Sequence, residues 1–349
     1  MGLWMHLEGL VVALIVGTRH EAVKVAPMVQ ELRRIGITPR VIDTGQQPGR
    51  VAEALAPFGV TVDGTLAIER RDGSLNELIS LAVTAADAYL RAAKPAAVLV
   101  QGDTTTALAV GLAAAMLSIQ LVHLEAGLRT GDRMQPFPDE TNRVMLADVA
   151  SLHLAPTAGA ARALAAEGLT GEHVVITGNT VVDALECLFP IVKDRPLPMG
   201  VTADHRSKIL VVTVHRRESW GQGVRAVAGA VKQLLVDRPT LHAVVVTHPN
   251  PAVRDDVHSV LGGVARCDLL PPLQYDDMLS LLSRADVVLT DSGGIQEEAP
   301  TLRVPVVVTR TVTERPEGVV AGWADLVGTD PLAIRSAVSR RLDNPGLPP

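Results

Sequence analysis

Hydrophobic residues recur along the chain in short runs, and each run is followed by turn residues and then by a helical pattern. In the first half such runs occupy residues 10–16 (LVVALIV), 39–45, 96–102 and 119–125. The segments between them carry apolar residues spaced three and four apart, which is the period of a helix. Strands that alternate with helices are joined by crossover connections, so the pattern predicts a doubly wound parallel α/β sheet.

The alternation is interrupted once and then resumes. Residues 189–208 (FPIVKDRPLPMGVTADHRSK) are rich in proline and charge and are typical of a linker. Apolar runs reappear at 209–215, 241–250, 268–274, 285–294 and 304–310. We therefore expect two similar α/β domains, 1–180 and 181–349. Ligands of such sheets bind beyond the carboxyl ends of the strands, so the expected site is the cleft between the domains.

The composition agrees with this architecture and limits the kinds of molecule that the protein is expected to bind. Hydrophobic residues make up 47% of the chain and aromatic residues only 2%, so the core is built from Ala, Val, Leu and Ile, as in a buried parallel sheet. The formal net charge of -6 argues against nucleic acid as a partner, because such a protein needs a basic face. A small anion held by a few arginines remains compatible with this charge.

Several classes of protein are excluded by what the sequence lacks. Cys187 and Cys267 have no metal-type spacing and indicate a reducing compartment. Residues 1–21 lack the basic region and cleavage site of a signal peptide, and no apolar run reaches the roughly 18 residues of a membrane span. There is no G-x-G-x-x-G, P-loop, H-E-x-x-H or CxxC pattern. We expect a soluble cytoplasmic protein with no membrane partner, no metal and no cofactor.

Polar residues follow the predicted strands of the first domain. Arg19 lies near a helix start, where an anion is favoured, although a solvated helix start is the alternative. Lys24 falls on the same helix. Asp103 follows the third run and is either a site residue or only the N-cap of the next helix. Glu125 ends an apolar strand, and a carboxylate in that position needs a partner or a task.

Two further groups of polar residues are candidate site residues, one in each half of the chain. Glu140 and Arg143 are three residues apart and share one face of a helix, with a surface ion pair as the alternative. In the second half, residues 291–294 (DSGG) end a strand and open a helix, where small residues let backbone N–H groups approach a phosphate. Glu297 is then placed to reach a ribose hydroxyl. Arg310 and Arg315 would complete a diphosphate clamp, but these features alone do not fix one activity.

Taken in order, the motifs resemble those of the non-hydrolysing UDP-N-acetylglucosamine 2-epimerases. They run from Gly17 to about Asp330 and read GTRHEAVKVAP, QGDTTTALA, HLEAGLRTGD, PDETNR, ITGNTVVDAL, HRRES, LTDSGGIQEEAP, TERPE and LVGTD. The resemblance implies a GT-B-like fold of two Rossmann-type domains, a UDP-sugar in the interdomain cleft, a homodimer and no cofactor. It also implies inversion at C2 to give UDP-N-acetylmannosamine, by elimination of UDP to 2-acetamidoglucal and re-addition.

The resemblance assigns the catalytic roles to Asp103, Glu125, Glu140 and His215. Asp103 and Glu125 are expected to shuttle the C2 proton, and Glu140 to assist. His215 either stabilises the β-phosphate oxygen or takes part in proton transfer. Which carboxylate serves which face of the sugar stays open.

Substrate binding is carried over in the same way. Diphosphate binding falls on Arg19, Ser292, Gly293, Gly294 and Arg315. Ribose binding falls on Glu297, and Lys24 and Arg143 hold the sugar or the neighbouring carboxylates.

The segment 212–223 (VTVHRRESWGQG) places charge at the end of an apolar strand. On the family pattern it is the first strand of the second domain and delivers His215 to the leaving diphosphate. Arg216 is expected to contact the diphosphate or the effector region. Arg217 and Glu218 are expected to form a local pair.

Bacterial members of the family bind a second UDP-N-acetylglucosamine as an activator, and the matching effector residues here are Gln46, Arg216 and His248. The sequence departs from the family pattern at His20, Gln47, Asp72, Thr311, Val312 and Trp323. Gln47 and Asp72 argue against retained activation. The chain also ends at DNPGLPP, where relatives continue with a helical tail. These departures leave room for a modified UDP-hexosamine as the substrate.

Three other readings compete with the epimerase. A GT-B glycosyltransferase would need one base and an acceptor pocket rather than carboxylates on three successive segments. A hydrolysing epimerase would release UDP and N-acetylmannosamine. A UDP-sugar sensor without turnover is disfavoured by the presence of Asp103, Glu125, Glu140 and His215.

Overall fold

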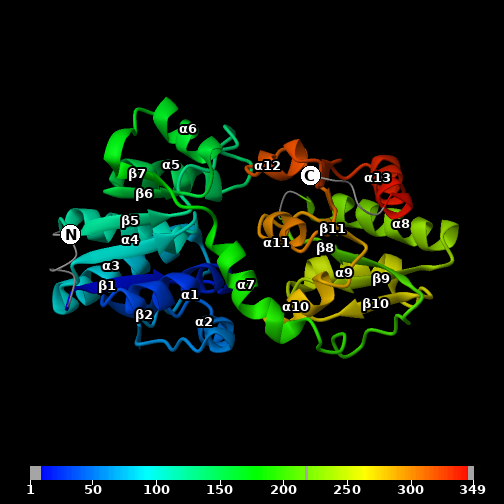
Figure 1. Ribbon diagram of the computed structural model, residues 1–349, viewed down its shortest axis with the longest axis horizontal. Coiled ribbons are helices and arrows are strands. Elements are labelled where there is room, and N and C mark those ends of the chain that lie inside the picture. Colours follow the sequence, from blue (N-terminus) through cyan, green and yellow to red (C-terminus); the bar gives the residue numbers. More distant parts are fainter. Residues whose placement is uncertain (1–8, 217–218, 345–349) are drawn as a thin grey trace. The chain divides into compact units, whose positions relative to one another are not determined.

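A computed structural model describes residues 9–216 and 219–344 (Figure 1). The chain divides into two compact units, Met1–Cys187 and Leu188–Pro349. Helix α7 (Thr180–Val192) spans this division, and the boundary expected from the sequence lies at its start. The first part of the expected linker, 189–192, is therefore helical, and residues 193–207 contain neither helix nor strand.

Unit 1 contains a seven-stranded parallel sheet in the order β3-β2-β1-β4-β5-β6-β7. Its strands are β1 Val11–Val16, β2 Thr38–Asp43, β3 Gly64–Thr65, β4 Ala97–Gln101, β5 Gln120–Leu124, β6 Leu152–Ala155 and β7 Val174–Ile176. The accompanying helices are α1 Arg19–Arg34, α2 Arg50–Leu55, η1 Ala56–Phe58, α3 Leu75–Ala93, α4 Thr105–Met116, α5 Asp139–Val149, α6 Ala158–Ala166 and η2 Gly171–His173.

Unit 2 contains a six-stranded parallel sheet in the order β10-β9-β8-β11-β12-β13. Its strands are β8 Lys208–Thr213, β9 Leu241–Val246, β10 Cys267–Leu270, β11 Val287–Thr290, β12 Val306–Val308 and β13 Ala324–Leu326. Its helices are α8 Gln222–Asp237, α9 Pro251–Leu261, α10 Tyr275–Leu282, α11 Ile295–Thr301, α12 Pro316–Val320 and α13 Pro331–Asp343.

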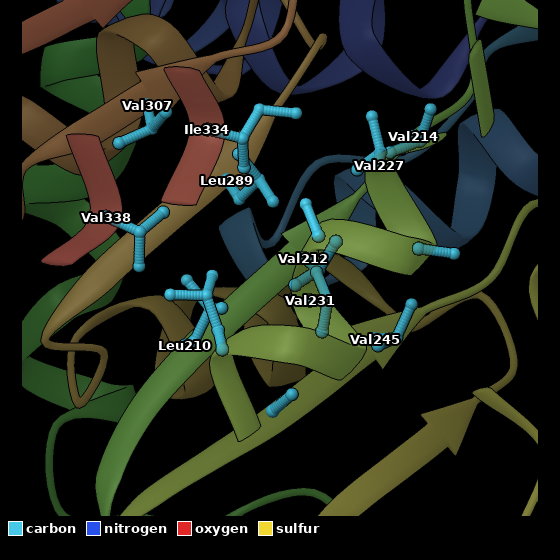
Figure 2. Packing of buried hydrophobic residues seen from close by; sticks show 14 of the residues in the cluster. Leu210, Val212, Val214, Val227, Val231, Val245, Leu289, Val307, Ile334 and Val338 are labelled. Atoms are coloured by element: carbon cyan, nitrogen blue, oxygen red, sulfur yellow. The ribbon is translucent and has the colours of Figure 1, made fainter. Parts of the chain in front are cut away.

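The continuous apolar runs in unit 2 are explained by burial of both faces of the sheet. Leu210 and Val212 of β8 pack on one side with α8 and α13, as Figure 2 shows. Ile209 and Val211, which point the opposite way, pack with α10 and α11. A strand covered on both sides has no polar face, so it reads as an unbroken Val/Ile/Leu run. Truncating a core residue such as Leu210 to alanine typically costs about 2–5 kcal/mol of stability.

Each sheet has a switch point, where the order of the strands reverses direction. It lies between β1 and β4 in unit 1 and between β8 and β11 in unit 2, and both pairs are parallel. The crossovers leave a switch point to opposite sides, so the loops beyond it diverge and leave room for a ligand. Arg19 and Asp103 follow the two switch strands of unit 1, and His215 and Asp291 follow those of unit 2.

Across 9–216 and 219–344, no helix combines the length and the apolar character needed to cross a membrane.

Candidate active site

Glu125 is the residue directly after β5, and its partner is Lys24 of α1. The two form a buried ion pair, and the Gln101 side chain donates to the same Glu125 oxygen, Oε2, at 3.1 Å. Glu125 has a φ of 65°, a left-handed conformation that is rare outside glycine. A buried carboxylate is tolerated when it is paired and hydrogen-bonded. Lys24 and Gln101 are therefore the partners that a carboxylate at the end of an apolar strand requires.

Arg143 links the two other carboxylates. Its guanidinium bonds Asp103 Oδ2 through Nε, at 3.1 Å, and through the adjacent terminal nitrogen. Its other terminal nitrogen lies 2.8 Å from Glu140 Oε2, with both side chains buried. The alternative of a surface ion pair is therefore wrong. Glu140 Oε1 accepts from the backbone N–H groups of Thr130 and Gly131, both at 3.0 Å, so this carboxylate holds a loop as well as an arginine.

Asp103 is not the cap of α4. The N-cap is Thr104, whose hydroxyl accepts from the Ala107 N–H at 3.0 Å. The Asp103 carbonyl instead accepts from the Asn142 side chain at 2.8 Å, which ties the loop to α5. The Asp103 side chain is 23% exposed, whereas Glu140 is 2% exposed, so Asp103 is the more accessible carboxylate of the arginine-linked pair.

Two further buried titratable residues, Glu21 and His123, lie beside this site. Glu21 accepts from the Gly17 and Thr18 N–H groups at 2.8 and 2.6 Å and from the Thr104 hydroxyl at 2.6 Å. Burial raises the pKa of Glu21 despite these bonds. His123 of β5 is also buried; its Nε2 lies 2.7 Å from the Gly102 carbonyl, and burial lowers its pKa to about 4. The signal for Glu21 was present, because T-x-x-E is a capping box.

The turn after β1 is closely packed around Gly17. A Cβ at this position would lie 2.5 Å from Gln46 Nε2 and 2.7 Å from the hydroxyls of Thr44 and Thr106, so a larger residue would have to displace these side chains. Gln46 Nε2 donates to the Thr106 hydroxyl at 3.2 Å. Arg19 begins α1 two residues further on. The structure thus brings the predicted effector residue Gln46 to the same turn that leads into Arg19.

In unit 2, His215 is joined to Asp291, the residue that follows β11. Asp291 is fully buried, with an exposed fraction of 0%, and accepts from the His215 N–H at 2.9 Å and the Arg216 N–H at 2.8 Å. The His215 Nδ1 lies 3.0 Å from Asp291 Oδ1. Burial by itself would raise the pKa of Asp291, but the charge of His215 and these hydrogen bonds outweigh it and lower the pKa. Asp291 is therefore ionised.

The His215 ring lies in a small ring cluster. His248, which follows β9, stacks on it with ring centroids 6.3 Å apart and an interplanar angle of 12°. Trp220 is tilted against His248 at 6.4 Å and donates from its indole to the His215 carbonyl at 3.1 Å. His248 Nδ1 accepts from the Asn250 N–H at 3.1 Å. The predicted catalytic and effector histidines thus share one cluster.

The remaining predicted residues of unit 2 meet around Arg315. Its Nε donates to Glu297 Oε1 at 2.7 Å, and it also pairs with Glu314. A Cβ at Gly293 would lie 2.6 Å from an Arg315 nitrogen, so the guanidinium packs directly on this glycine. Arg310 is buried, and its Nη1 lies 2.9 Å from Glu314 Oε2, so Arg310 pairs with the same glutamate as Arg315.

Ser292 and Gly294 complete the turn between β11 and α11. The Ser292 N–H donates to the Thr290 hydroxyl at 2.9 Å, and Gly294 is the N-cap of α11. Arg217 and Glu218 lie outside the described residues. Within the described ranges, no group of three or more His, Cys, Asp or Glu side chains is arranged to hold a metal ion.

Two Rossmann-like parallel sheets with polar clusters at their switch points define a GT-B-like protein. The sequence profile of the UDP-N-acetylglucosamine 2-epimerases matches residues 30–347. The chain belongs to this family of isomerases, which confirms the family expected from the motifs.

Individual relatives agree over nearly the whole chain. The UDP-N-acetylglucosamine 2-epimerase of Bacillus subtilis is 38% identical over 340 residues, covering 97% of this chain and 89% of the relative. The crystal structure of UDP-GlcNAc 2-epimerase from Neisseria meningitidis, bound to UDP-GlcNAc, has a TM-score of 0.91 and 35% identity, covering 96% and 92% of the two chains. A glycotransferase of kitacinnamycin, 14% identical with a TM-score of 0.61, shares the fold alone.

Proposed function

We propose that this protein interconverts UDP-N-acetylglucosamine and UDP-N-acetylmannosamine by eliminating UDP and adding it back. The observation that carries the proposal is the set of three carboxylates Asp103, Glu125 and Glu140 in the loops that follow β4 and β5 of unit 1: Lys24 pairs with Glu125, and Arg143 pairs with the other two. Carboxylates in such positions suit proton transfer at a carbon, and this chemistry needs no redox cofactor.

The reaction sets what the residues have to do. The C2 proton of the sugar is not acidic, so the C1–O bond breaks with or before its removal. The C2 proton passes to a carboxylate, a C1–C2 double bond forms, and the diphosphate leaves with the C1–O electron pair. Addition reverses these steps with the proton delivered to the other face of C2. Carboxylates stabilise the positive ring, and cations stabilise the leaving group.

We assign the proton transfers to Asp103 and Glu125. Asp103 is partly exposed, and its Oδ2 is oriented by Arg143. Glu125 is held by the ion pair with Lys24, and the carboxylate of such a pair is a hydrogen-bond acceptor that can take up a proton. Glu140 assists by fixing Arg143, since its two oxygens already accept from that arginine and from two backbone N–H groups. Lys24 and Arg143 orient the carboxylates and hold the sugar.

The diphosphate is assigned mainly to unit 2. Ser292, Gly293 and Gly294 form a turn of small residues that lets backbone N–H groups approach phosphate oxygens, and Arg315 packs on this turn. Arg19 of unit 1 supplies a further cation. Glu297 takes a ribose hydroxyl, which requires it to share or release its bond with Arg315. His215 stabilises the β-phosphate oxygen as it departs.

Assembly and location are part of the same proposal. We assign a homodimer, because Met116 at the end of α4 and Met145 on α5 leave large apolar side chains 78% and 43% exposed. We place the protein in the cytoplasm, where its two free cysteines, Cys187 and Cys267, fit a reducing compartment.

Effector binding is assigned to Gln46, Arg216 and His248. The departures at Gln47 and Asp72 predict that a second UDP-N-acetylglucosamine has little effect on the rate.

Proton NMR of UDP-N-acetylglucosamine with the enzyme in heavy water tests the activity. The expected result is loss of the C2 proton signal together with the appearance of UDP-N-acetylmannosamine, with no acceptor present. Free UDP accumulating with N-acetylmannosamine would instead identify a hydrolysing enzyme. No exchange at C2 with added UDP-sugar would contradict the proposal, as would full exchange in both Asp103→Asn and Glu125→Gln.

A further inference from the structure

We propose that Asp291 is a positioning residue for the reaction, which selects the tautomer of His215 and presents its Nε2 to the departing diphosphate. This inference rests on the proposed function, because it takes His215 as the residue that meets the substrate. Asp291 itself is fully buried and acts through the histidine.

The Asp291 carboxylate contacts both the imidazole and the backbone N–H of His215. Asp291 Oδ1 lies 3.0 Å from His215 Nδ1, and Oδ2 lies 2.9 Å from the His215 backbone nitrogen. A second backbone N–H, that of Arg216, donates to Oδ2 at 2.8 Å. An ionised carboxylate only accepts hydrogen bonds, so His215 Nδ1 must carry the proton. Nε2 is then the nitrogen left for the substrate, and the His215 side chain is 33% exposed.

Two neighbouring rings help to fix the orientation of His215 and carry no charge themselves. His248 covers one face of the His215 ring, and the Trp220 indole anchors the His215 carbonyl. Burial, and then the positive charge of His215, lower the pKa of His248, so the stacked ring stays neutral. The Asp291 carboxylate faces His215 from the neighbouring strand and stabilises the imidazolium, which forms when Nε2 takes up a second proton from solvent; that Nε2–H then donates to the departing diphosphate oxygen.

A purely structural role would not require this arrangement. Strands β8 and β11 are already joined beside Asp291 by the hydroxyls of Thr213 and Thr290, 2.6 Å apart. At the opposite end of β11, Asp286 makes the corresponding structural link, accepting from the Ile209 N–H at 2.8 Å and from Lys208 at 2.7 Å. Asp286 therefore provides a matched control: an aspartate that ties the same two strands together far from the histidine.

The test compares Asp291→Asn with Asp286→Asn in the full chain. In Asp291→Asn the amide nitrogen faces His215 Nδ1 and donates to it, which moves the ring proton to Nε2. We expect kcat to fall by about 10²- to 10⁴-fold, the range seen when an aspartate or second-sphere partner that orients a histidine is changed. The Kd for UDP should change by less than about threefold, because binding through Arg315 and Glu297 persists. Asp286→Asn should leave both quantities unchanged.

Nitrogen-15 NMR of the histidine side chains supplies a readout that folding stability does not move. The His215 signal, assigned by its loss in His215→Gln, should report Nδ1–H in the unchanged enzyme and in Asp286→Asn, and Nε2–H in Asp291→Asn. An Nε2–H tautomer in the unchanged enzyme overturns the inference, even if Asp291→Asn fails to fold.

Unaltered kcat in Asp291→Asn, with the unchanged enzyme active, overturns the inference as well. If the unchanged enzyme shows no C2 exchange, the proposed function fails, while the tautomer measurement still decides the Asp291–His215 relationship.

Discussion

Lys24 and Glu125 lie 101 positions apart in the sequence and form a buried ion pair at the carboxyl end of the unit 1 sheet. Lys24 comes from α1, which follows β1, and Glu125 follows β5, with β4 lying between these strands. Either residue would be costly to bury without the other. The same contact therefore contributes both to the stability of the sheet and to the position of the proposed proton acceptor, Glu125.

Lys24→Met should destabilise the protein by about 3–5 kcal/mol, because it leaves a buried carboxylate without its cation. The double variant Lys24→Met/Glu125→Gln should recover much of this loss, and both variants should be inactive. Urea unfolding measures the stabilities. Arg34→Met, which removes an exposed pair with Glu31, is the control and should change stability far less. Equal losses in Lys24→Met and the control would show that the buried pair is not structurally important.

Arg143→Lys should lower kcat/KM by roughly 10²-fold, since an ammonium group cannot hold Asp103 and Glu140 together as a planar guanidinium does. The matched control is Arg129→Lys, which alters a two-nitrogen contact with Glu167 in the same unit and should keep its activity. Rates of C2 exchange in heavy water give the comparison. If the two variants lose activity equally, the contacts of Arg143 with Asp103 and Glu140 are not specifically required for activity.

His123 should make the protein less stable in acid. Its pKa is about 4 in the fold against about 6.5 when unfolded, so the unfolded chain binds the extra proton. Because of this difference, the free energy of unfolding is highest above pH 6.5, where His123 is neutral in both states. It falls by about 3 kcal/mol as the pH is lowered from 6.5 toward 4.

In His123→Gln this part of the pH dependence should disappear, as measured by urea unfolding at pH 7, 5.5 and 4. The exposed His205→Gln should follow the unchanged protein. An identical pH dependence in His123→Gln and the unchanged protein would be inconsistent with a buried neutral histidine.

Gly17→Ala should sharply reduce turnover, by roughly 10²-fold, because the added Cβ would press on Gln46, Thr44 and Thr106 and displace the turn that leads to Arg19. Gly229→Ala on α8 meets no atom within 4 Å and serves as the control. It should retain activity and gain about 0.5–1 kcal/mol of stability from better helix propensity. Steady-state kinetics and thermal unfolding report both effects, and full activity in Gly17→Ala would show that the turn can yield.

The sequence was informative where a general rule connects pattern to position. Long apolar runs predicted β1, β4, β5, β8 and β11, and the rule that ligands meet the carboxyl ends of strands pointed to Asp103, Glu125 and His215. Strands β3, β6, β7 and β13 were not predicted. β3 is Gly64–Thr65 and β13 is Ala324–Leu326, and two or three residues alone are too few to show a period; the equally short β12, Val306–Val308, was predicted because it lies in the longer apolar run 304–310.

Pairings could not be predicted, because they depend on strand order. Asp291 was visible as part of a turn of small residues, but its bond to His215 exists only because β8 and β11 are neighbours. The burial of Arg143 and Glu140 likewise follows from the way α5 packs beside α4, which their three-residue spacing does not reveal.

The left-handed backbone of Glu125 has a consequence for evolution and engineering. Glycine adopts this conformation without strain, and an apolar side chain at position 24 would remove the need for a buried charge. A library at positions 24 and 125 that is sorted for heat resistance should drift toward Lys24→Met with Glu125→Gly. The same library sorted for turnover should return to the lysine–glutamate pair, so the two selections diverge at one contact.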